Sequence, residues 1–169
     1  MSVTAANGFE AGGVACGIKP SGAPDLALVA TVDRRPVSAA GVFTTNLVQA
    51  APVQVSRDHL GNGRAAAVVL NSGNANAATG ENGRRDARRM CELTAESLGC
   101  APEDVLVCST GLIGVPLPMA PIEAGIPELA ETLGAHGDLA AEAILTTDTV
   151  RKEARERVEL ADEIGRAHV

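Results

Sequence analysis

A run of small polar residues and glycines between residues 105 and 114 has the composition of a site that binds negative charge. Three apolar residues, 105–107, lead into Cys108 and then into Ser109, Thr110 and Gly111, and Gly114 and two prolines follow. A strand that breaks into such a turn leaves backbone N–H groups without sheet partners, and these groups can bind an anion or stabilise a developing oxyanion. The same residues also fit a plain strand-to-loop turn, which the local sequence alone favours.

Two other polar stretches follow predicted elements in the same way. Residues 71–80 are rich in Asn and Gly, which accept left-handed backbone and bond their own main chain, so they fit a scaffold loop and a site-lining loop equally well. Residues 146–149 read Thr-Thr-Asp-Thr and come after a predicted helix. Taken in isolation, this second stretch is best interpreted as a hydroxyl-rich loop.

Charge and aromatic content argue against a nucleic-acid partner. The net charge is −7, which disfavours a polyanion, and aromatic residues make up only 1% of the chain, which leaves almost nothing to stack on bases. One basic cluster alternates with an apolar stripe at helical spacing, so a solvated helix face is favoured over a phosphate site. The cluster consists of Arg84, Arg85, Arg88 and Arg89.

Histidines and cysteines give no metal or disulfide signature. His59, His136 and His168 are scattered without ligand spacing, and no Cys-x-x-Cys pair exists, so we expect no metal. The first residues have no basic region followed by an apolar segment, and no apolar run reaches membrane-spanning length. We therefore expect a cytoplasmic protein with no membrane association. Its four thiols should be reduced.

The remaining sequence predicts a single domain, residues 1–169, of mixed α/β class with sheet and helices in layers. A hydrophobic content of 46% is enough for a core. Helices are expected at 84–98, closed by Gly99, at 122–133 with a kink or split at Pro127, and at 139–145 with Asp138 as the cap. The tail, 151–169, fits a helix or an edge strand. Strands are expected at 11–18, 26–32, 39–43, 52–55, 65–70 and 103–107.

Several stretches together resemble the N-terminal part of the ornithine acetyltransferase family, also called bifunctional glutamate N-acetyltransferase or ArgJ. The most specific are Asn-Ser-Gly-Asn-Ala-Asn at 71–76 and Cys-Ser-Thr-Gly-Leu-Ile-Gly-Val-Pro-Leu-Pro-Met at 108–119. Any one stretch is weak, but the ordered set is specific and reaches from residue 8 to about residue 154. The other matching stretches are 8–9, 12–19, 25–29, 41–44, 51–53 and 143–149 with Lys152 and Glu153.

This resemblance implies an N-terminal-nucleophile-like fold, of which the chain is the α-chain part. Family members cut themselves before a threonine, and the α and β chains stay together as an α2β2 heterotetramer. The threonine hydroxyl takes acetyl from N-acetylornithine and passes it to glutamate, which is ping-pong covalent catalysis in the cyclic arginine biosynthesis pathway. No metal or organic cofactor is implied. Acetyl-CoA is a substrate only if the enzyme also makes N-acetylglutamate directly.

By motif, the resemblance assigns Thr110 and Gly111 to the oxyanion hole, and Thr146 to substrate binding with Thr147 as the second choice. The family's Gly-Gly-x-Ala-Lys-Gly segment and Ala-Thr cleavage point are absent before Val169. We therefore expect the nucleophilic threonine to lie downstream, on the partner β chain, and the chain alone to be inactive.

Two other functions remain open at this stage. The chain could belong to a self-cleaving amidase or peptidase of the same architecture, in which case acetate would be released without a requirement for glutamate. It could also be a degenerate, non-enzymatic fragment that binds an amino acid or a partner chain.

Overall fold

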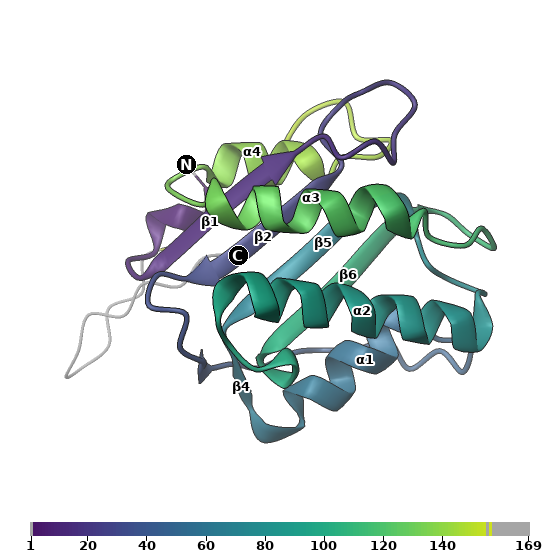
Figure 1. The fold of residues 1–169 in the computed structure, drawn as a ribbon, viewed down its shortest axis with the longest axis horizontal. Coiled ribbons are helices and arrows are strands. Elements are labelled where there is room, and N and C mark those ends of the chain that lie inside the picture. Colours follow the sequence, from purple (N-terminus) through teal and green to yellow (C-terminus); the bar gives the residue numbers. More distant parts are fainter. Residues whose placement is uncertain (1, 155, 157–169) are drawn as a thin grey trace.

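The computed structural model describes residues 2–154 and 156, and its centre is a four-stranded sheet with helices on both faces (Figure 1). The strand order is β1-β2-β5-β6; β1, β2 and β5 pair antiparallel, whereas β5 and β6 pair parallel. The predicted mixed α/β class is confirmed. The strands of this sheet are β1 (Phe9–Val14), β2 (Leu26–Thr31), β5 (Ala67–Asn74) and β6 (Val105–Leu112), and the helices are α1 (Ala51–His59), α2 (Gly80–Leu98), α3 (Met119–Glu131) and α4 (Gly137–Ala143).

Short elements complete the chain at the periphery. A two-stranded sheet pairs β3 (Val37–Ser38) with β4 (Arg64–Ala65) antiparallel. Three 3-10 turns lie at Val3–Ala5, Leu60–Asn62 and Pro102–Asp104.

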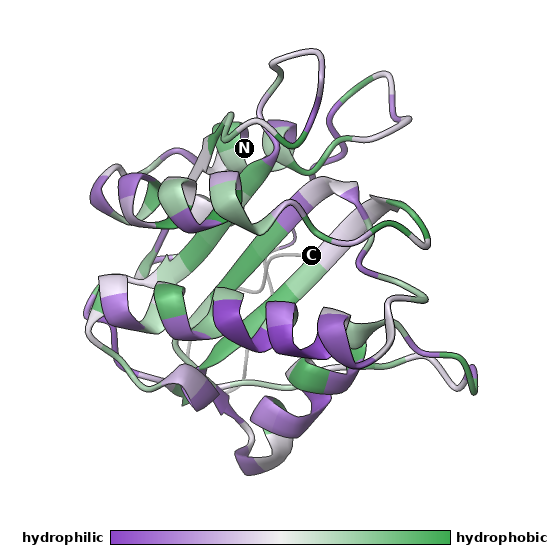
Figure 2. Cartoon of the chain, turned by 45° about the vertical axis from the view of Figure 1, so that its right-hand side comes forward, coloured by the Kyte–Doolittle hydropathy of each residue, from purple (hydrophilic) through white to green (hydrophobic). Residues whose placement is uncertain are grey.

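Helices α1, α2 and α3 cover one face of the sheet and enclose the main core. Side chains alternate between the two faces of a strand, so Leu26 and Leu28 of β2 point to the same side as Val69 of β5 and Val107 of β6. All four are at most 1% exposed and belong to one apolar cluster with buried residues of these three helices. Figure 2 shows the matching pattern, in which the strands are mostly hydrophobic and α2 carries its hydrophilic residues on one side.

The opposite face of the sheet is covered only in part. Helix α4 packs on β1 and β2 through a small cluster built from alanines: Ala11, Ala27, Ala140 and Ala143. Beyond α4, this face carries apolar side chains of β2, β5 and β6 that are only partly buried. We call this part the open face; its apolar residues are Val29, Val68, Leu70 and Leu106.

Strand β6 is an edge strand, and α1 covers the first part of its free edge. The Ser56 hydroxyl donates to the Val107 carbonyl at 2.7 Å and accepts from the Val107 N–H at 2.9 Å. The His59 ring nitrogen Nδ1 lies 2.8 Å from the Val105 carbonyl oxygen. These contacts satisfy backbone groups that an uncovered edge leaves open to another chain.

Several predictions about single elements are confirmed. Strand β2 is almost fully buried, α2 ends at Leu98, and Gly99 follows it in the left-handed region with φ of 73°. The apolar stripe on α2 faces the core, while the arginine cluster lies on the opposite side. Three of its members, Arg84, Arg85 and Arg89, pair with neighbouring carboxylates.

The four cysteines form no disulfide with one another. In the described part of the chain no helix is both long and apolar enough to cross a bilayer.

Other predictions are wrong. Residues 52–55 begin helix α1 rather than a strand, because Pro52 sits in the first helical turn, where its missing N–H costs nothing, and Ala51, Val55 and Ser56 bury one helical face. Residues 39–43 form no strand. The first strand ends at Val14 and not at Ile18.

Two strand ends, one helix and one helix cap also differ from the prediction. Strand β5 continues through residues 71–74 and β6 through 108–112, because the parallel pairing between them extends to Leu112. Helix α3 runs through Pro127, so of the two predicted alternatives, a kink or a split, the split is wrong. Asp138 lies in the first turn of α4 rather than at its cap, which is His136. Most of the predicted tail element, 151–169, lies outside the described residues.

Candidate functional site

The edge of β6 beyond Val107 leaves backbone groups directed away from the sheet. In a strand, the N–H and C=O of one residue point to the same side, and successive residues alternate. The backbone carbonyls of Val105 and Val107 point outward, to α1. The Leu112 carbonyl points inward, to β5, and accepts the Ala75 N–H at 2.8 Å. The alternation therefore directs the Gly111 N–H outward, past the reach of α1.

The Thr110 side chain lies next to this N–H, on the open face. Its register partner is Ser72 of β5, and both belong to the series that points away from α1, α2 and α3. Thr110 and Gly111 are both exposed. The hydroxyl and the outward N–H together present two donors at one corner of the sheet, which is the arrangement that a developing oxyanion needs.

Position 111 can hold only glycine without moving the neighbouring strand. A Cβ at Gly111 would lie 2.3 Å from the carbonyl carbon of Gly73 and 2.6 Å from the Asn74 nitrogen, both backbone atoms. Its φ of 133° is also a value that side-chain-bearing residues rarely adopt. The close approach of β6 to β5 thus depends on this glycine.

A buried carboxylate holds the loop that packs against the end of β5. Asp25 is fully buried and accepts backbone N–H groups from four consecutive residues of the loop after β1, Cys16 to Lys19, at 2.6 to 3.2 Å. Burial by itself raises the pKa of this carboxyl, but the bonds from the Lys19, Cys16 and Ile18 N–H groups hold the pKa below its usual value. This loop in turn contacts Gly73, whose added Cβ would lie 3.0 Å from Ile18.

The predicted substrate-binding threonines lie at the same end of the sheet as Thr110. The Ser72 hydroxyl, on the register partner of Thr110, donates to the carbonyl of Ala143, the last residue of α4. Thr146 and Thr147 follow three and four residues later and are exposed. Figure 1 shows this yellow segment at the end toward which β5 and β6 run. The structure therefore brings the two predicted pairs to one end of the sheet.

The thiols near this corner are poor nucleophiles. Desolvation by neighbouring atoms raises the pKa of the Cys108 thiol, two residues before Thr110, although the residue is exposed, and burial together with Asp25 raises the pKa of Cys16 to about 12. Both are therefore protonated near neutral pH, and the thiolate is the reactive form. Among residues 2–154 and 156, no group of His, Cys, Asp and Glu has the arrangement of a metal site.

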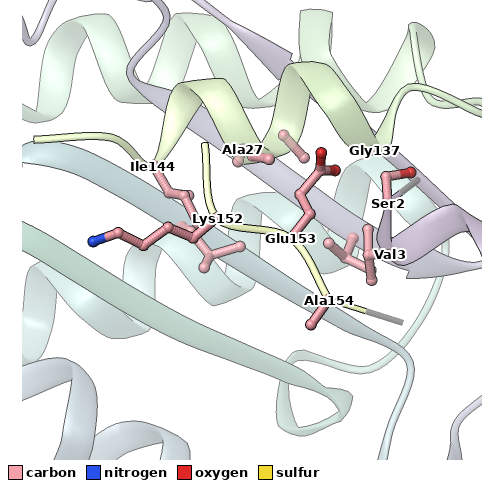
Figure 3. A pocket seen from close by; sticks show the side chains of 12 residues that line it. Ser2, Val3, Ala27, Gly137, Ile144, Lys152, Glu153 and Ala154 are labelled. Carbon is pink, nitrogen blue, oxygen red and sulfur yellow. The ribbon is translucent and has the colours of Figure 1, made fainter. Parts of the chain in front are cut away.

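An apolar pocket of about 210 Å³ lies on the open face and is separate from this corner. Figure 3 shows Ile144, which directly follows α4, together with Ser2, Val3 and the 152–154 segment around it. None of the predicted site residues lines it. Since its walls are apolar apart from Lys152, Glu153 and Ser2, we interpret it as part of the incompletely covered sheet face.

Sequence reasoning missed three polar residues that shape the corner: Asp25, Ser72 and Ser109. A usable signal existed for Asp25, because an acidic residue directly before a fully buried strand needs donors close by. Ser72 and Ser109 lie in stretches that the sequence singled out, but neither was assigned a role, since β5 and β6 extend further than their apolar runs.

Comparison with known sequences gives a consistent family. The profile of the ArgJ family matches residues 10–168. Two curated proteins, each called arginine biosynthesis bifunctional protein ArgJ, are similar to the chain. The one from Symbiobacterium thermophilum is 54% identical over 161 residues, which is 94% of this chain and 40% of that protein. The one from Streptomyces coelicolor is 55% identical over 153 residues, 90% of this chain and 40% of that protein. The chain thus spans about 40% of the length of these relatives.

Solved structures agree with the sequence comparison. The arginine biosynthesis bifunctional protein ArgJ from Bacillus halodurans superposes with a TM-score of 0.92 at 38% identity, covering 99% of this chain and 87% of that one. The ornithine acetyltransferase from Mycobacterium tuberculosis, solved in complex with ornithine, gives a TM-score of 0.85 at 40% identity and covers 99% and 96%.

Proposed function

Because this chain belongs to the ArgJ family, we propose that it is the N-terminal, oxyanion-binding portion of an enzyme that transfers acetyl from N-acetylornithine to glutamate. The two donors at the corner of β6 carry this proposal. Relatives called bifunctional arginine biosynthesis proteins, and a similar structure that holds ornithine, support the substrate class. The downstream polypeptide supplies the nucleophilic threonine. Whether acetyl-CoA also serves as a donor depends on residues outside this chain.

The proposed role of the chain is to stabilise charge during acyl transfer. The downstream threonine hydroxyl attacks the acetyl carbonyl of N-acetylornithine, and its proton passes through a base to the departing ornithine amine. Before ornithine leaves, the carbonyl oxygen of the tetrahedral intermediate carries negative charge, which the Thr110 hydroxyl and the Gly111 N–H bind by donating hydrogen bonds; the C=O re-forms as the C–N bond breaks. Glutamate attacks the acetyl-threonine in a second step, which uses the same two donors.

The exposed threonines after α4 suit the amino-acid part of the substrate. A hydroxyl both donates to a carboxylate and accepts from an ammonium group. Thr146 is our first choice from the motif resemblance, and Thr147 is the second. The bond from Ser72 to Ala143 keeps the end of α4 close to the strand that carries Thr110. A substrate whose amino-acid part binds at Thr146 and whose other end reaches Thr110 would place its acetyl group at the corner of β6.

We also propose that the downstream polypeptide covers the open face, as the β chain of an α2β2 assembly. Apolar side chains on three neighbouring strands are only partly buried there, and exposed apolar patches of this kind mark interaction sites. The residues are those of the open face defined above. Thr110 points to the same side, so a polypeptide docked there would carry its own groups to the oxyanion site.

The decisive experiment is intact mass spectrometry of the full-length protein with and without N-acetylornithine. We expect two chains, the downstream one beginning with threonine and gaining one acetyl group. Thr110→Ala should lower kcat about 100-fold with little change in KM, as for other oxyanion donors, whereas Thr110→Ser keeps the hydroxyl and should stay within about fivefold. A Thr110→Ala enzyme with parental turnover contradicts the assignment. Acetate release without glutamate points to a hydrolase instead.

The docking surface is tested by placing a charge on it. Leu106→Lys should reduce co-purification of the downstream chain at least fivefold, because a buried, unpaired ammonium opposes association. Val32→Lys is the matched control, since Val32 is a 52% exposed apolar residue beyond the end of β2. If both variants retain the downstream chain equally, the open face is not the docking surface.

A further inference from the structure

We propose that Asn71 and Ser109, which each have one buried polar side-chain atom and do not touch the substrate, position the Gly111 N–H for the reaction. This inference rests on the proposed function, because it names the support of the same oxyanion site. It concerns the asparagine-rich stretch that the sequence left open between a scaffold and a site-lining loop. Two buried polar atoms and four hydrogen bonds carry the inference.

Asn71 and Ser109 lie side by side on the helix-covered face of the sheet. They are register partners on β5 and β6, and they follow Val69 and Val107 in the inward series. Asn71 is 1% exposed. Among residues 2–154 and 156, neither the Asn71 Oδ1 nor the Ser109 Oγ has a hydrogen-bond partner. One atom is an acceptor and the other bears a donor, but they are too far apart to bond directly, so we infer that one water accepts from the Ser109 hydroxyl and donates to the Asn71 Oδ1.

The other polar atom of Asn71 holds the irregular part of β5. Its Nδ2 donates to the Asn74 carbonyl at 2.8 Å. Asn74 lies where the β5–β6 register shifts, opposite both Thr110 and Leu112. Gly111 packs against this irregularity, since a Cβ on it would lie 2.6 Å from the Asn74 nitrogen. Asn71 therefore connects Ser109, which lies two residues before Gly111, to the backbone of Asn74, which Gly111 touches.

The Asn74 side chain holds the chain after β6 in the same way. Its Nδ2 donates to the carbonyls of Val115 and Pro116 at 3.1 and 3.0 Å, and its Oδ1 accepts the Asn76 N–H at 2.9 Å. Asparagines of β5 thus hold the chain on both sides of Gly111. The stretch acts as a buried support of the site rather than as its lining.

The expected effect is on the chemical step. An oxyanion donor acts only when it points at the place where charge develops, and a shift of half an ångström weakens it. The oxyanion exists in the transition state and not in bound substrate, so losing alignment lowers kcat and leaves KM largely unchanged. A purely structural loss would instead lower stability and the amount of active enzyme without this selective change.

The test compares Ser109→Ala, Ser109→Cys and Asn71→Leu in the full-length protein. Ala removes the hydroxyl, Cys keeps the volume but donates weakly, and Leu keeps the shape of Asn without its polar atoms. We expect kcat per active site, counted by acetyl-threonine titration, to fall about tenfold in all three, with KM within twofold. The double variant Asn71→Leu with Ser109→Ala should lose no more than the larger single variant, because the two act as one unit.

Thr94→Val is the matched control, because it removes one fully buried hydroxyl that donates to the Met90 carbonyl within α2. It should lower thermal stability and leave kcat unchanged. Amide exchange of the 107–115 peptide, followed by mass spectrometry, adds a readout that needs no activity. Exchange should become faster in the Ser109 and Asn71 variants and stay parental in Thr94→Val.

The outcomes separate this inference from the proposed function. If Thr110→Ala loses turnover but the Ser109 and Asn71 variants keep parental kcat and exchange, the function stands and the positioning role is wrong. If Ser109→Cys turns over like the parent while Ser109→Ala does not, volume and not hydrogen bonding matters, which also overturns it. If the parent transfers no acetyl group, the proposed function fails. If amide exchange of the 107–115 peptide is also unchanged in the Ser109 and Asn71 variants, the positioning role is wrong as well. Should Asn71→Leu fail to fold, the two Ser109 variants decide.

Discussion

Replacing Asp25 by Asn is the perturbation with the clearest physical consequence. The carboxylate accepts one N–H on Oδ1, from Cys16, and three on Oδ2, from Gly17, Ile18 and Lys19. An Asn oxygen can take the place of Oδ2, but its three bonds become neutral and weaken by about 1 kcal/mol each. The Asn NH2 then faces the Cys16 N–H, which loses its acceptor at a cost of about 1–3 kcal/mol. With the lower end of that cost, the expected total loss is about 4 kcal/mol.

The measurement is differential scanning calorimetry of the full-length protein at pH 7. For a unit of this size, about 4 kcal/mol corresponds to a fall in Tm of about 8–16 °C. Asp33→Asn is the matched control, because Asp33 is exposed and accepts a single N–H, from Arg35 at 3.1 Å. Its Tm should stay within about 2 °C of the parent, since exposed single bonds contribute little.

The pH dependence gives an independent check with a defined sign. The folded-state pKa of Asp25 lies below its usual value, so its stabilisation is complete above the unfolded pKa of about 3.9 and is lost as pH falls through the lower folded value. The difference in Tm between parent and Asp25→Asn should be constant from pH 7 to about pH 5 and shrink below about pH 4. A difference below 2 °C at pH 7, or one that stays the same at pH 3, would refute the role of the charge.

Three further predictions concern the corner and its supports. Gly111→Ala should reduce kcat at least 100-fold because its Cβ meets Gly73, whereas Gly114→Ala, which has a positive φ but no atom within 4 Å, should keep activity within about fivefold in the same acetyl-transfer assay. Ser56→Ala should destabilise the protein by about 2 kcal/mol or more in calorimetry, because the Val107 N–H and C=O lose their partner. The control Ser97→Ala, which removes a hydroxyl bonded within α2, should cost less than about 1 kcal/mol. Equal losses would contradict the role of Ser56 in covering the edge of β6. Thr146→Val should raise KM for N-acetylornithine about tenfold with a smaller change in kcat, and unchanged KM and kcat would remove Thr146 from the pocket.

The sequence predicts best where a local pattern and burial agree. The apolar run of β2 and the amphipathic α2 with Gly99 after it are regular enough to be recognised without tertiary information. The segment 52–55 is different, since alternating Val and Gln fit a strand, and only the position of Pro52 at a helix start and the burial of Ser56 against β6 decide for a helix. Tertiary contact overrides the local pattern there.

The ends of β5 and β6 show why the candidate site was only partly predictable. Asn and Gly are poor strand formers and the polar residues beside them end the apolar runs, so the sequence predicts that both strands end about four or five residues early. They continue because each provides the other's hydrogen bonds, a property of the pair that neither segment reveals alone. The threonine and glycine were found through motif resemblance, but the outward direction of the Gly111 N–H follows only from the register and from the contact of Ser56 with Val107.

The alanine contact between α4 and the sheet limits which substitutions this chain can accept over evolutionary time. An added Cβ at Gly13 would lie 2.3 Å from the Leu139 carbonyl oxygen, so helix and strand backbones nearly touch. A deep mutational scan should find that Gly13, Ala27 and Ala140 tolerate almost nothing larger than alanine. Because α4 ends three residues before Thr146, a bulkier residue there would displace the substrate-binding segment as well as reduce stability. Substrate preference could therefore drift through changes in a helix that touches no substrate.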